Sequence, residues 1–231
     1  MCGRYAQFRS IEAVRAFFGT SGPPPNHPPS WNVAPTQTAP VVRRHPETGE
    51  RRLDLLRWGL LPGWVRDPKG ARQPINARAE TVSSSPMFRK AFAERRCLVP
   101  ADAFYEWKAE PGGKQPFAIA RRDGEMLAFA GLWEHWRGEG DEVVRSFAIL
   151  TTAANAPMRR VHDRMPVVLA PADWPAWLEG PDPGGLLRPA PDEVLRLWPV
   201  SRAVNALRNN GPDLLEEHRP PPAPEGGPNP A

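Results

Sequence analysis

The sequence predicts an α+β fold, with a mostly antiparallel, barrel-like β core and short peripheral helices. Most of its apolar and aromatic residues fall into short runs of strand length, rather than into long segments with helical spacing. Turn residues bound these runs. The few stretches with helical spacing are short and scattered among the strands, which is typical of α+β proteins.

The predicted strands begin at Leu53 and continue through most of the chain. They comprise LDLLRWGLL, CLVPA, AFYEW, PFAIA, MLAFAGLW, SFAILTT and PVVLA. Turn sequences such as PGG, DG and GEGDE separate them, and these sequences favour tight connections between antiparallel strands.

A short helix is predicted directly after Ser10, which is a suitable N-cap. Ile11, Val14 and Phe18 fall on one face of this helix, and Gly19 ends it. The stretch GTSGPPPNHPPS that follows is too rich in proline and glycine for regular structure and predicts a surface loop. Further short helices are predicted at Met87–Ala93, Ala156–Val161, Pro171–Leu178 and Pro191–Leu197.

The chain has 231 residues, a length that suits one domain with a sizeable core. We expect this single domain to cover residues 1–217. Residues 218–231, with the sequence HRPPPAPEGGPNPA, lack apolar residues to bury and predict a disordered proline-rich tail.

Several classes of protein are excluded by what the sequence lacks. No apolar stretch approaches the length of a membrane span, and no apolar leader follows MCGRY. The only two cysteines, Cys2 and Cys97, exclude a disulfide framework, so we expect a reducing, cytoplasmic location. Without a Cys-x-x-Cys motif, a helical histidine pair or a glycine-rich phosphate loop, we expect no metal and no cofactor.

The charge balance is basic, with a formal net charge of +4 and a pI of about 9.5. A basic surface attracts polyanions, of which nucleic acid is the usual one. However, arginine far outnumbers lysine, and the chain is rich in Ala, Pro and Gly, which GC-rich codons also encode. Genomic composition therefore remains an alternative explanation, and charge alone favours nucleic acid only weakly.

The amino terminus, MCGRYAQ, places a cysteine directly behind the initiator methionine. Chain termini are usually the least ordered part of a domain, so we expect no buried structural thiol there. If Met1 is removed, Cys2 carries a free α-amine and a thiol on adjacent carbons. This 1,2-aminothiol has a chemistry that no internal cysteine shares.

Three internal motifs carry polar side chains in unusual settings. In AFYEWK, Glu106 lies in an aromatic strand, where it is either half of an edge salt bridge or a catalytic acid or base. His162 precedes a turn and titrates near neutral pH, yet it is equally suited to a structural pairing with Asp163. In PINARAET, Asn76 and Arg78 share a face if the segment is extended. Taken singly, His162, Asn76 and Arg78 are explained more readily by structure than by function, while for Glu106 the two explanations are even.

Taken together, these motifs resemble those of the SRAP (SOS response-associated peptidase) family, also called abasic-site processing proteins. The resemblance covers nearly the whole chain and rests on MCGRY, WNVAPTQ, RWGLLPGW, INARAET, FRKAF, RRCLVPADAFYEW, KQPFAI, FAGLWE, ILTTAAN, HDRMPVVL and PVSRAVN. Two departures are small: Ala103 replaces a usual glycine, and Pro86 replaces a frequent basic residue. The second would weaken one phosphate contact.

The resemblance implies covalent capture of abasic sites in single-stranded DNA during the DNA damage response, without cofactor or metal. By position, Cys2 matches the family's nucleophile, and its supporting active-site residues match Asn76, Glu106 and His162. The motifs that the family uses around DNA contain Arg4, Trp64, Arg78 and Arg164. It further implies a thiazolidine crosslink through Cys2, a peptidase activity that removes Met1, and a monomer that associates with the nucleoid.

Two alternatives remain open. An N-terminal-nucleophile glutamine amidotransferase also begins Met-Cys-Gly, and glutaminase activity without DNA crosslinking would favour it. The other alternative is a basic module that binds single strands without covalent chemistry. Loss of all bound DNA under denaturing conditions would favour that module.

Overall fold

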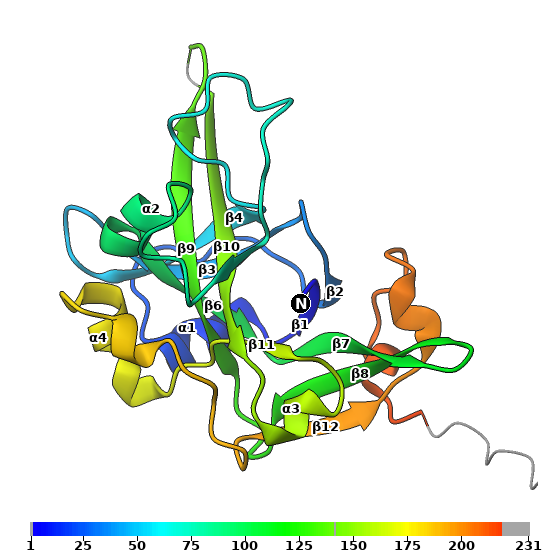
Figure 1. The fold of residues 1–231 in the computed structure, drawn as a ribbon. Coiled ribbons are helices and arrows are strands. Elements are labelled where there is room, and N and C mark those ends of the chain that lie inside the picture. Colours follow the sequence, from blue (N-terminus) through cyan, green and yellow to red (C-terminus); the bar gives the residue numbers. More distant parts are fainter. Residues whose placement is uncertain (1, 141, 219–231) are drawn as a thin grey trace, which may run out of the picture.

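The computed structural model describes residues 2–140 and 142–218. Its centre is a ring of five strands, in the order β10-β4-β3-β6-β9, which the pairing of β9 with β10 closes (Figure 1). The strands are β3 (Thr38–Arg44), β4 (Arg51–Trp58), β6 (Arg96–Ala101), β9 (Leu127–Arg137) and β10 (Val143–Ala153). Within the ring only the β10–β4 pair is parallel. The prediction of a mostly antiparallel, barrel-like core is therefore confirmed.

Two short strands extend this barrel at β10. Strand β5 (Asn76–Arg78) pairs with β10 in parallel, and β11 (Arg164–Pro166) pairs with it in the antiparallel sense. Both strands belong to motifs that the sequence singled out, so β10 brings the NAR and RMP segments to one side of the barrel.

A second, open sheet has the strand order β12-β8-β7-β1-β2 and is antiparallel throughout. Its strands are β1 (Arg4–Gln7), β2 (Ser30–Val33), β7 (Ala103–Glu110), β8 (Gly113–Arg121) and β12 (Leu195–Pro199). The chain passes from the barrel strand β6 into β7 at the buried Asp102, whose Oδ2 accepts hydrogen bonds from the Phe8 and Arg9 amides at 2.7 and 3.1 Å.

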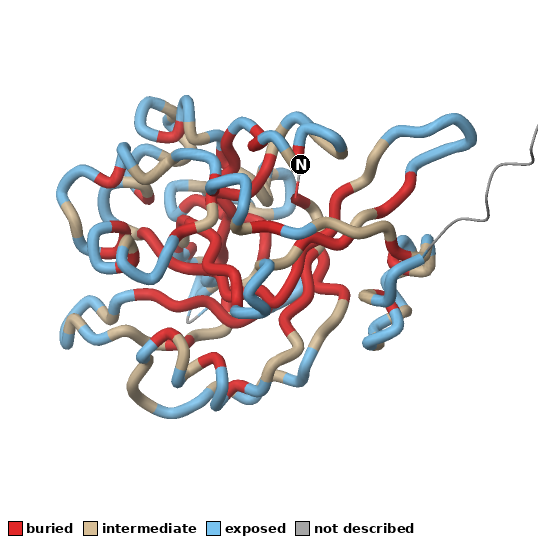
Figure 2. The backbone as a smooth tube through the Cα atoms, turned by 90° about the horizontal axis from the view of Figure 1, so that it is seen from below, coloured by how far each residue is buried: buried red, intermediate tan, exposed pale blue. Residues whose placement is uncertain are grey.

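One apolar cluster joins the two sheets. Tyr5 of β1 packs against Trp58 of the barrel with ring centroids 5.2 Å apart, and Phe104 of β7 meets Phe129 of β9 at 5.7 Å. All four side chains are fully buried. Figure 2 shows the buried backbone at the centre of the molecule and the exposed loops around it.

The helices are short and peripheral, as predicted. Helix α1 (Ile11–Phe18) is capped by Ser10, whose Oγ accepts a hydrogen bond from the Ala13 amide at 3.2 Å, and it ends at Gly19 with φ of 61°. The others are α2 (Arg89–Glu94), α3 (Ala156–Arg159) and α4 (Trp174–Glu179), with 3-10 turns η1 (Pro171–Asp173), η2 (Gly184–Leu186), η3 (Arg202–Asn205) and η4 (Pro212–Leu215).

Two predicted elements are wrong. The helix expected at Pro191–Leu197 does not form: residues 192–194 are a turn, and the chain from Leu195 is strand β12, which pairs with β8. Leu195 is buried and the next residue, Arg196, is exposed, as the alternation of a strand requires. The strand expected from Pro166 onward instead ends at Pro166, and Val168 makes only an isolated bridge to Phe129. Four strands were not predicted from the sequence: β1, β2, β3 and β5. Polar residues in these segments interrupt the alternation of apolar and polar residues that marks a strand.

The predicted tail at residues 218–231 lies outside the described residues except for His218, whose backbone amide donates to the Pro199 carbonyl at 2.8 Å. The extent of a single domain over residues 1–217 stays a prediction. Among residues 2–140 and 142–218, no helix has both the length and the apolar character needed to cross a bilayer.

Candidate active site

The site lies at the point along strand β7 where its pairing with β1 ends. Strand β1 begins at Arg4, which pairs with Tyr105, so no strand among the described residues lies beside β7 on this flank from Glu106 onward. The chain segment that enters β1 is Cys2-Gly3, which brings the amino terminus to this open edge (Figure 1). Side chains from both faces of the open sheet can therefore reach one opening.

Cys2 is fully buried, which corrects the expectation that a terminal thiol would not be buried. The terminus is held in place because β1 lies between β7 and β2 and leads the preceding residues into the core. The thiol Sγ lies 3.9 Å from the Arg4 carbonyl, to which it donates a weak hydrogen bond. Burial raises the pKa of the Cys2 thiol, and the Glu106 carboxylate raises it further, so the thiol is protonated at neutral pH.

Asn76 holds the backbone of Cys2. Its Nδ2 donates to the Cys2 carbonyl at 2.9 Å, and the parallel pairing of Asn76 with Ile149 fixes its place on β5. The amide oxygen Oδ1 is buried without a hydrogen-bond partner among the described residues. This oxygen can accept a hydrogen bond from an amine or a hydroxyl group brought to Cys2.

Glu106 and His162 line the same pocket, which has a volume of about 480 Å³. The Glu106 side chain is only 4 % exposed, and its Oε1 accepts a hydrogen bond from the Trp107 amide at 3.3 Å. An acid or base at this position acts in a largely water-excluded setting, and the Glu106 carboxylate raises the pKa of the Cys2 thiol. Glu106 is thus a buried side chain that lines a pocket, and its role as an acid or base stays a prediction.

His162 lies between α3 and β11 with two partners for one ring nitrogen. Nδ1 is 3.0 Å from the Arg164 amide, which donates to it, and 2.8 Å from Oδ1 of Asp163. These contacts require opposite states of Nδ1: without a proton it accepts from the amide, and with a proton it donates to the carboxylate. Nδ1 of His162 therefore has a hydrogen-bond partner whether or not it carries a proton.

Arg4 completes this pocket as a fixed cation. Its Nη1 donates to Asn32 Oδ1 at 2.8 Å and to the Val204 carbonyl at 2.9 Å. Three further lining residues were missed from the sequence: Trp107, Lys114 and Asn205. The indole Nε1 of Trp107 donates to Asn205 Oδ1 at 2.8 Å. The sequence feature that pointed to Asn205 is the PVSRAVN motif, which ends at this residue.

Arg78 and Arg164 do not line the pocket that holds Glu106 and His162. Arg78 is exposed and lines a separate cavity of about 360 Å³ together with Asn76. Arg164 is already engaged, because its Nη2 lies 2.9 Å from Glu80 Oε2 and 2.7 Å from the Thr151 carbonyl. This hydrogen bond from Arg164 lowers the pKa of Glu80. A phosphate that binds Arg164 through the N–H groups now held by Glu80 competes with that carboxylate.

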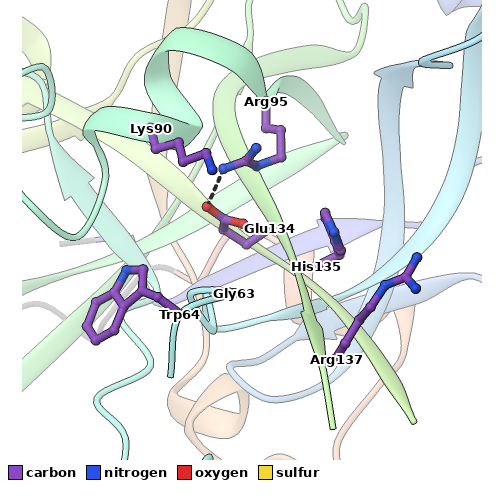
Figure 3. Close-up of a pocket in the computed structure, with 7 residues that line it drawn as sticks. All are labelled: Gly63, Trp64, Lys90, Arg95, Glu134, His135 and Arg137. Atoms are coloured by element: carbon purple, nitrogen blue, oxygen red, sulfur yellow. Dashed lines mark hydrogen bonds and ion pairs between the residues drawn. The ribbon is translucent and has the colours of Figure 1, made fainter. Parts of the chain in front are cut away.

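Trp64 is not brought to the Cys2 pocket. Its side chain is 66 % exposed and belongs to a separate hollow of about 330 Å³, beside the Glu134–Arg95 ion pair of 2.7 Å (Figure 3). Lys90, His135 and Arg137 supply the basic character of this hollow. The loop that carries Trp64 is anchored by Trp136, whose Nε1 donates to the Val65 carbonyl at 2.6 Å.

Within the described part of the chain, no group of three or more His, Cys, Asp or Glu side chains lies close enough together to hold a metal ion. The expectation that the protein uses no metal or cofactor stays a prediction.

Similar proteins cover almost the whole chain. YoqW of Bacillus subtilis is 38 % identical in an alignment of 226 positions, which covers 94 % of this chain and 100 % of the relative. YedK of Escherichia coli is 33 % identical, covering 94 % and 99 %. HMCES of Xenopus tropicalis is 31 % identical, covering 81 % and 65 %. Each of these three relatives is named an abasic site processing protein.

Solved structures support the same relationship. A Bordetella bronchiseptica protein, 30 % identical, matches with a TM-score of 0.76 over 87 % of this chain and 100 % of that one. A Bacteroides thetaiotaomicron protein reaches 0.84 over 94 % and 100 %, although its 22 % identity supports the fold alone. The family model described as SOS response associated peptidase (SRAP) matches residues 1–207. The resemblance seen in the motifs is therefore confirmed, and the chain belongs to the SRAP family.

Proposed function

We propose that this protein captures abasic sites in single-stranded DNA by forming a thiazolidine between Cys2 and the sugar aldehyde, once Met1 has been removed. The observation that carries the proposal is the setting of Cys2, whose carbonyl is held by Asn76 while its thiol lies beside the buried Glu106. Relatives that match 94 % of this chain and are named abasic site processing proteins support the choice of substrate.

The chemistry follows from the two groups on Cys2. An α-amine has an ordinary pKa of about 8, so part of it is neutral at physiological pH and attacks the aldehyde carbon of the ring-opened deoxyribose. Loss of one water gives an imine. The sulfur then bonds to the imine carbon while the thiol proton is transferred to the nitrogen, which closes a five-membered ring. Atoms and electrons balance without an oxidant or reductant.

The surrounding residues supply the proton transfers. Because the Cys2 thiol is protonated at neutral pH, ring closure needs a base for its proton, and Glu106 is placed to accept that proton and pass it to nitrogen. His162, on the same pocket, protonates the sugar ring oxygen and so favours the open aldehyde. Asn76 orients the Cys2 amine through its buried Oδ1. The second step is fast because amine and thiol share one residue.

We further propose that Arg4, Arg78 and Arg164 contact phosphates around the lesion, and that the exposed Trp64 stacks on a base farther along the strand. Such contacts read no sequence and weaken with salt, because each neutralised phosphate releases counterions. An abasic position has no base to unstack, so a bend there costs less. We expect the protein to act as a monomer associated with the nucleoid.

The peptidase activity named for the family fits the same site. Met1 precedes Cys2 in the chain, so the bond to be hydrolysed ends at the residue whose thiol pKa the Glu106 carboxylate raises. We propose that this carboxylate also assists removal of Met1, which makes the reactive amine a product of the protein's own hydrolysis.

The proposal is tested by incubating an abasic single-stranded oligonucleotide with three variants and separating the products on a denaturing gel. Cys2→Ala is expected to give no heat-stable adduct, and Cys2→Ser to lose the stable ring because oxygen replaces sulfur. Cys97→Ala is the matched control, since Cys97 is equally buried but internal, and it should crosslink like the wild type.

A heat-stable adduct that persists in Cys2→Ala would contradict the assignment of Cys2. DNA retained by the wild type only under native conditions would favour the non-covalent binding module instead. Glutaminase activity without any adduct would favour the amidotransferase alternative.

A further inference from the structure

A second cavity, of about 570 Å³, adjoins the pocket that holds Glu106 and His162. Its floor is apolar and comes from the open sheet, where Phe117 of β8 and Leu197 of β12 lie partly exposed. Its opposite wall is α3 and the residues after it, which supply Pro157, Arg160 and Val161. Nothing in the capture of the aldehyde uses this cavity.

The strand register places the cavity directly beside the reacting groups. Phe117 is the residue that pairs with Glu106 across β7 and β8, and directly opposed residues of an antiparallel pair have Cβ atoms about 5 Å apart on one face. Lys108 lies two residues beyond Glu106 and shares its face. On the other wall, Val161 directly precedes His162. The cavity therefore begins about one side chain away from the proposed capture site.

The rim of the cavity is strongly basic. Four cations line it, against the single carboxylate of Asp192: Lys108, Arg122, Arg160 and Arg196. Asp192 is itself engaged, because its Oδ1 accepts from the Ala156 amide at 3.0 Å. Arg160 is exposed and makes no side-chain hydrogen bond or ion pair with the described residues. An aromatic and aliphatic floor beneath such a rim matches a flat base with an attached phosphate.

We propose that this cavity holds the nucleotide next to the abasic position, with its base against Phe117 and Leu197 and its phosphate near Arg160. This inference rests on the proposed function, which supplies the lesion at Cys2. An acidic peptide shares the negative charge, but continuity with the reacting carboxylate favours a neighbouring nucleotide over a separate partner. Affinity for the lesion then depends on the presence of an adjacent base, whatever its identity.

The test uses oligonucleotides in which a tetrahydrofuran replaces the abasic sugar. This analogue has no aldehyde, so the measurement reports binding alone and remains valid even if the covalent chemistry is wrong. Fluorescence anisotropy compares oligonucleotides that carry a base on both sides of the analogue with ones in which the 5′ or the 3′ neighbour is also a tetrahydrofuran. Removing the base on one side is expected to weaken wild-type binding about tenfold, as loss of one stacked base does.

Two variants distinguish the contribution of the base to binding from that of the phosphate. Phe117→Leu removes the aromatic face at similar volume, and we expect the tenfold dependence on the neighbouring base to fall to about twofold. Arg160→Glu is expected to weaken binding to all of the oligonucleotides and to make the salt dependence shallower by about one phosphate contact. Arg188→Glu is the matched control, because Arg188 is exposed but lines a different cavity, and it should match the wild type. Unchanged thermal unfolding confirms that the variants fold.

Equal affinity of the wild type for all of the oligonucleotides would overturn the inference, as would an unchanged base dependence in Phe117→Leu. A labelled peptide of glutamates ending in phenylalanine tests the alternative occupant, an acidic peptide. If it binds the wild type but not Phe117→Leu, while DNA affinity is unaffected, the cavity belongs to a protein partner. If instead no adduct forms with a true abasic oligonucleotide but the base dependence holds, only the covalent proposal fails.

Discussion

The two sheets of this protein differ in whether their strands are hydrogen-bonded along both edges. In the barrel, each of the five ring strands is hydrogen-bonded on both sides, so the ring itself has no free edge. In the open sheet, β1 pairs with β7 only from Arg4 to Ala6, and the rest of that flank of β7 has no strand beside it. The candidate site, with Cys2 and Glu106, lies at this unpaired flank.

The comparison shows how the fold divides stability from reactivity. Closure satisfies the backbone and packs large side chains such as Trp58, Phe129 and Phe147 inside the ring. The open flank keeps room for a substrate, while β5 and β11, both paired with β10, attach the site to the rigid barrel. The groups proposed to react thus lie at the unpaired flank of the open sheet, and strands paired with the closed barrel hold them there.

The largest effect is expected at the open flank. Glu106→Gln keeps the shape of the side chain but removes the base for the thiol proton, so adduct formation should slow by about 10²- to 10⁴-fold. Rapid-quench sampling of the reaction with an abasic oligonucleotide measures this rate. Glu110→Gln, farther along the same strand and exposed, is the matched control. Equal rates of adduct formation in the two variants would show that Glu106, and with it the open flank, does not take part in the reaction.

The barrel should respond in stability rather than in rate. Phe129→Ala removes a fully buried ring that contacts Tyr5 and Phe104, and we expect it to lower the free energy of unfolding by about 3–5 kcal/mol. Lys114→Ala in the open sheet should change that free energy by less than about 0.5 kcal/mol. Urea titrations give both values, and similar losses would abolish the proposed division between the sheets.

A smaller effect is expected where the barrel holds the site. Asn76→Ala removes the hydrogen bond to the Cys2 carbonyl and should slow adduct formation about tenfold, which corresponds to one lost hydrogen bond of about 1.4 kcal/mol. Thr81→Ala, which alters the same 360 Å³ cavity away from Cys2, serves for comparison. An unchanged rate for Asn76→Ala would show that the barrel does not position Cys2 through this contact.

The smallest effect concerns the ion pair between Glu80 and Arg164. Glu80→Gln frees Arg164 for phosphate, so we expect DNA affinity to rise by roughly threefold at low salt and its salt dependence to steepen by about one phosphate contact. Weaker binding would mean that Glu80 orients Arg164 toward the DNA instead of competing with it.

The same pair predicts a pH dependence. The pKa of Glu80 is lowered in the folded protein, so its stabilising contribution is present above the ordinary value of about 4.3 and is lost as pH falls through the lower folded value. Wild type should therefore unfold at higher urea than Glu80→Gln at neutral pH, and the difference should vanish as pH falls below about 4. A difference that persists in acid would exclude this ion pair as its cause.

Much of the barrel was predictable because its strands are long apolar runs. Their pattern is visible in the sequence even when the strands with which they pair are not known. The segment at Leu195–Pro199 was not, because the sequence around it contains both helical and alternating spacing, and pairing with β8 decides between them. The burial of Cys2 depends on β1, a strand of only four residues that the sequence does not mark.

The site was predictable only as a set of motifs. Their resemblance to one family named Cys2, Asn76, Glu106 and His162, and the fold brings Cys2 beside Asn76 and Glu106, with His162 on the Glu106 pocket. Contacts set by strand register stayed hidden, among them the opposition of Phe117 to Glu106 and the engagement of Arg164 by Glu80. Such contacts join residues far apart in the chain, which local patterns cannot reveal.

The most direct measurement is the intact mass of the purified protein, before and after incubation with an abasic oligonucleotide, followed by digestion to locate the adduct. We expect a chain that begins at Cys2, a mass gain equal to the oligonucleotide less one water, and the modification on the amino-terminal peptide. A chain that still carries methionine yet forms the adduct, or a modification on any other peptide, would contradict the account.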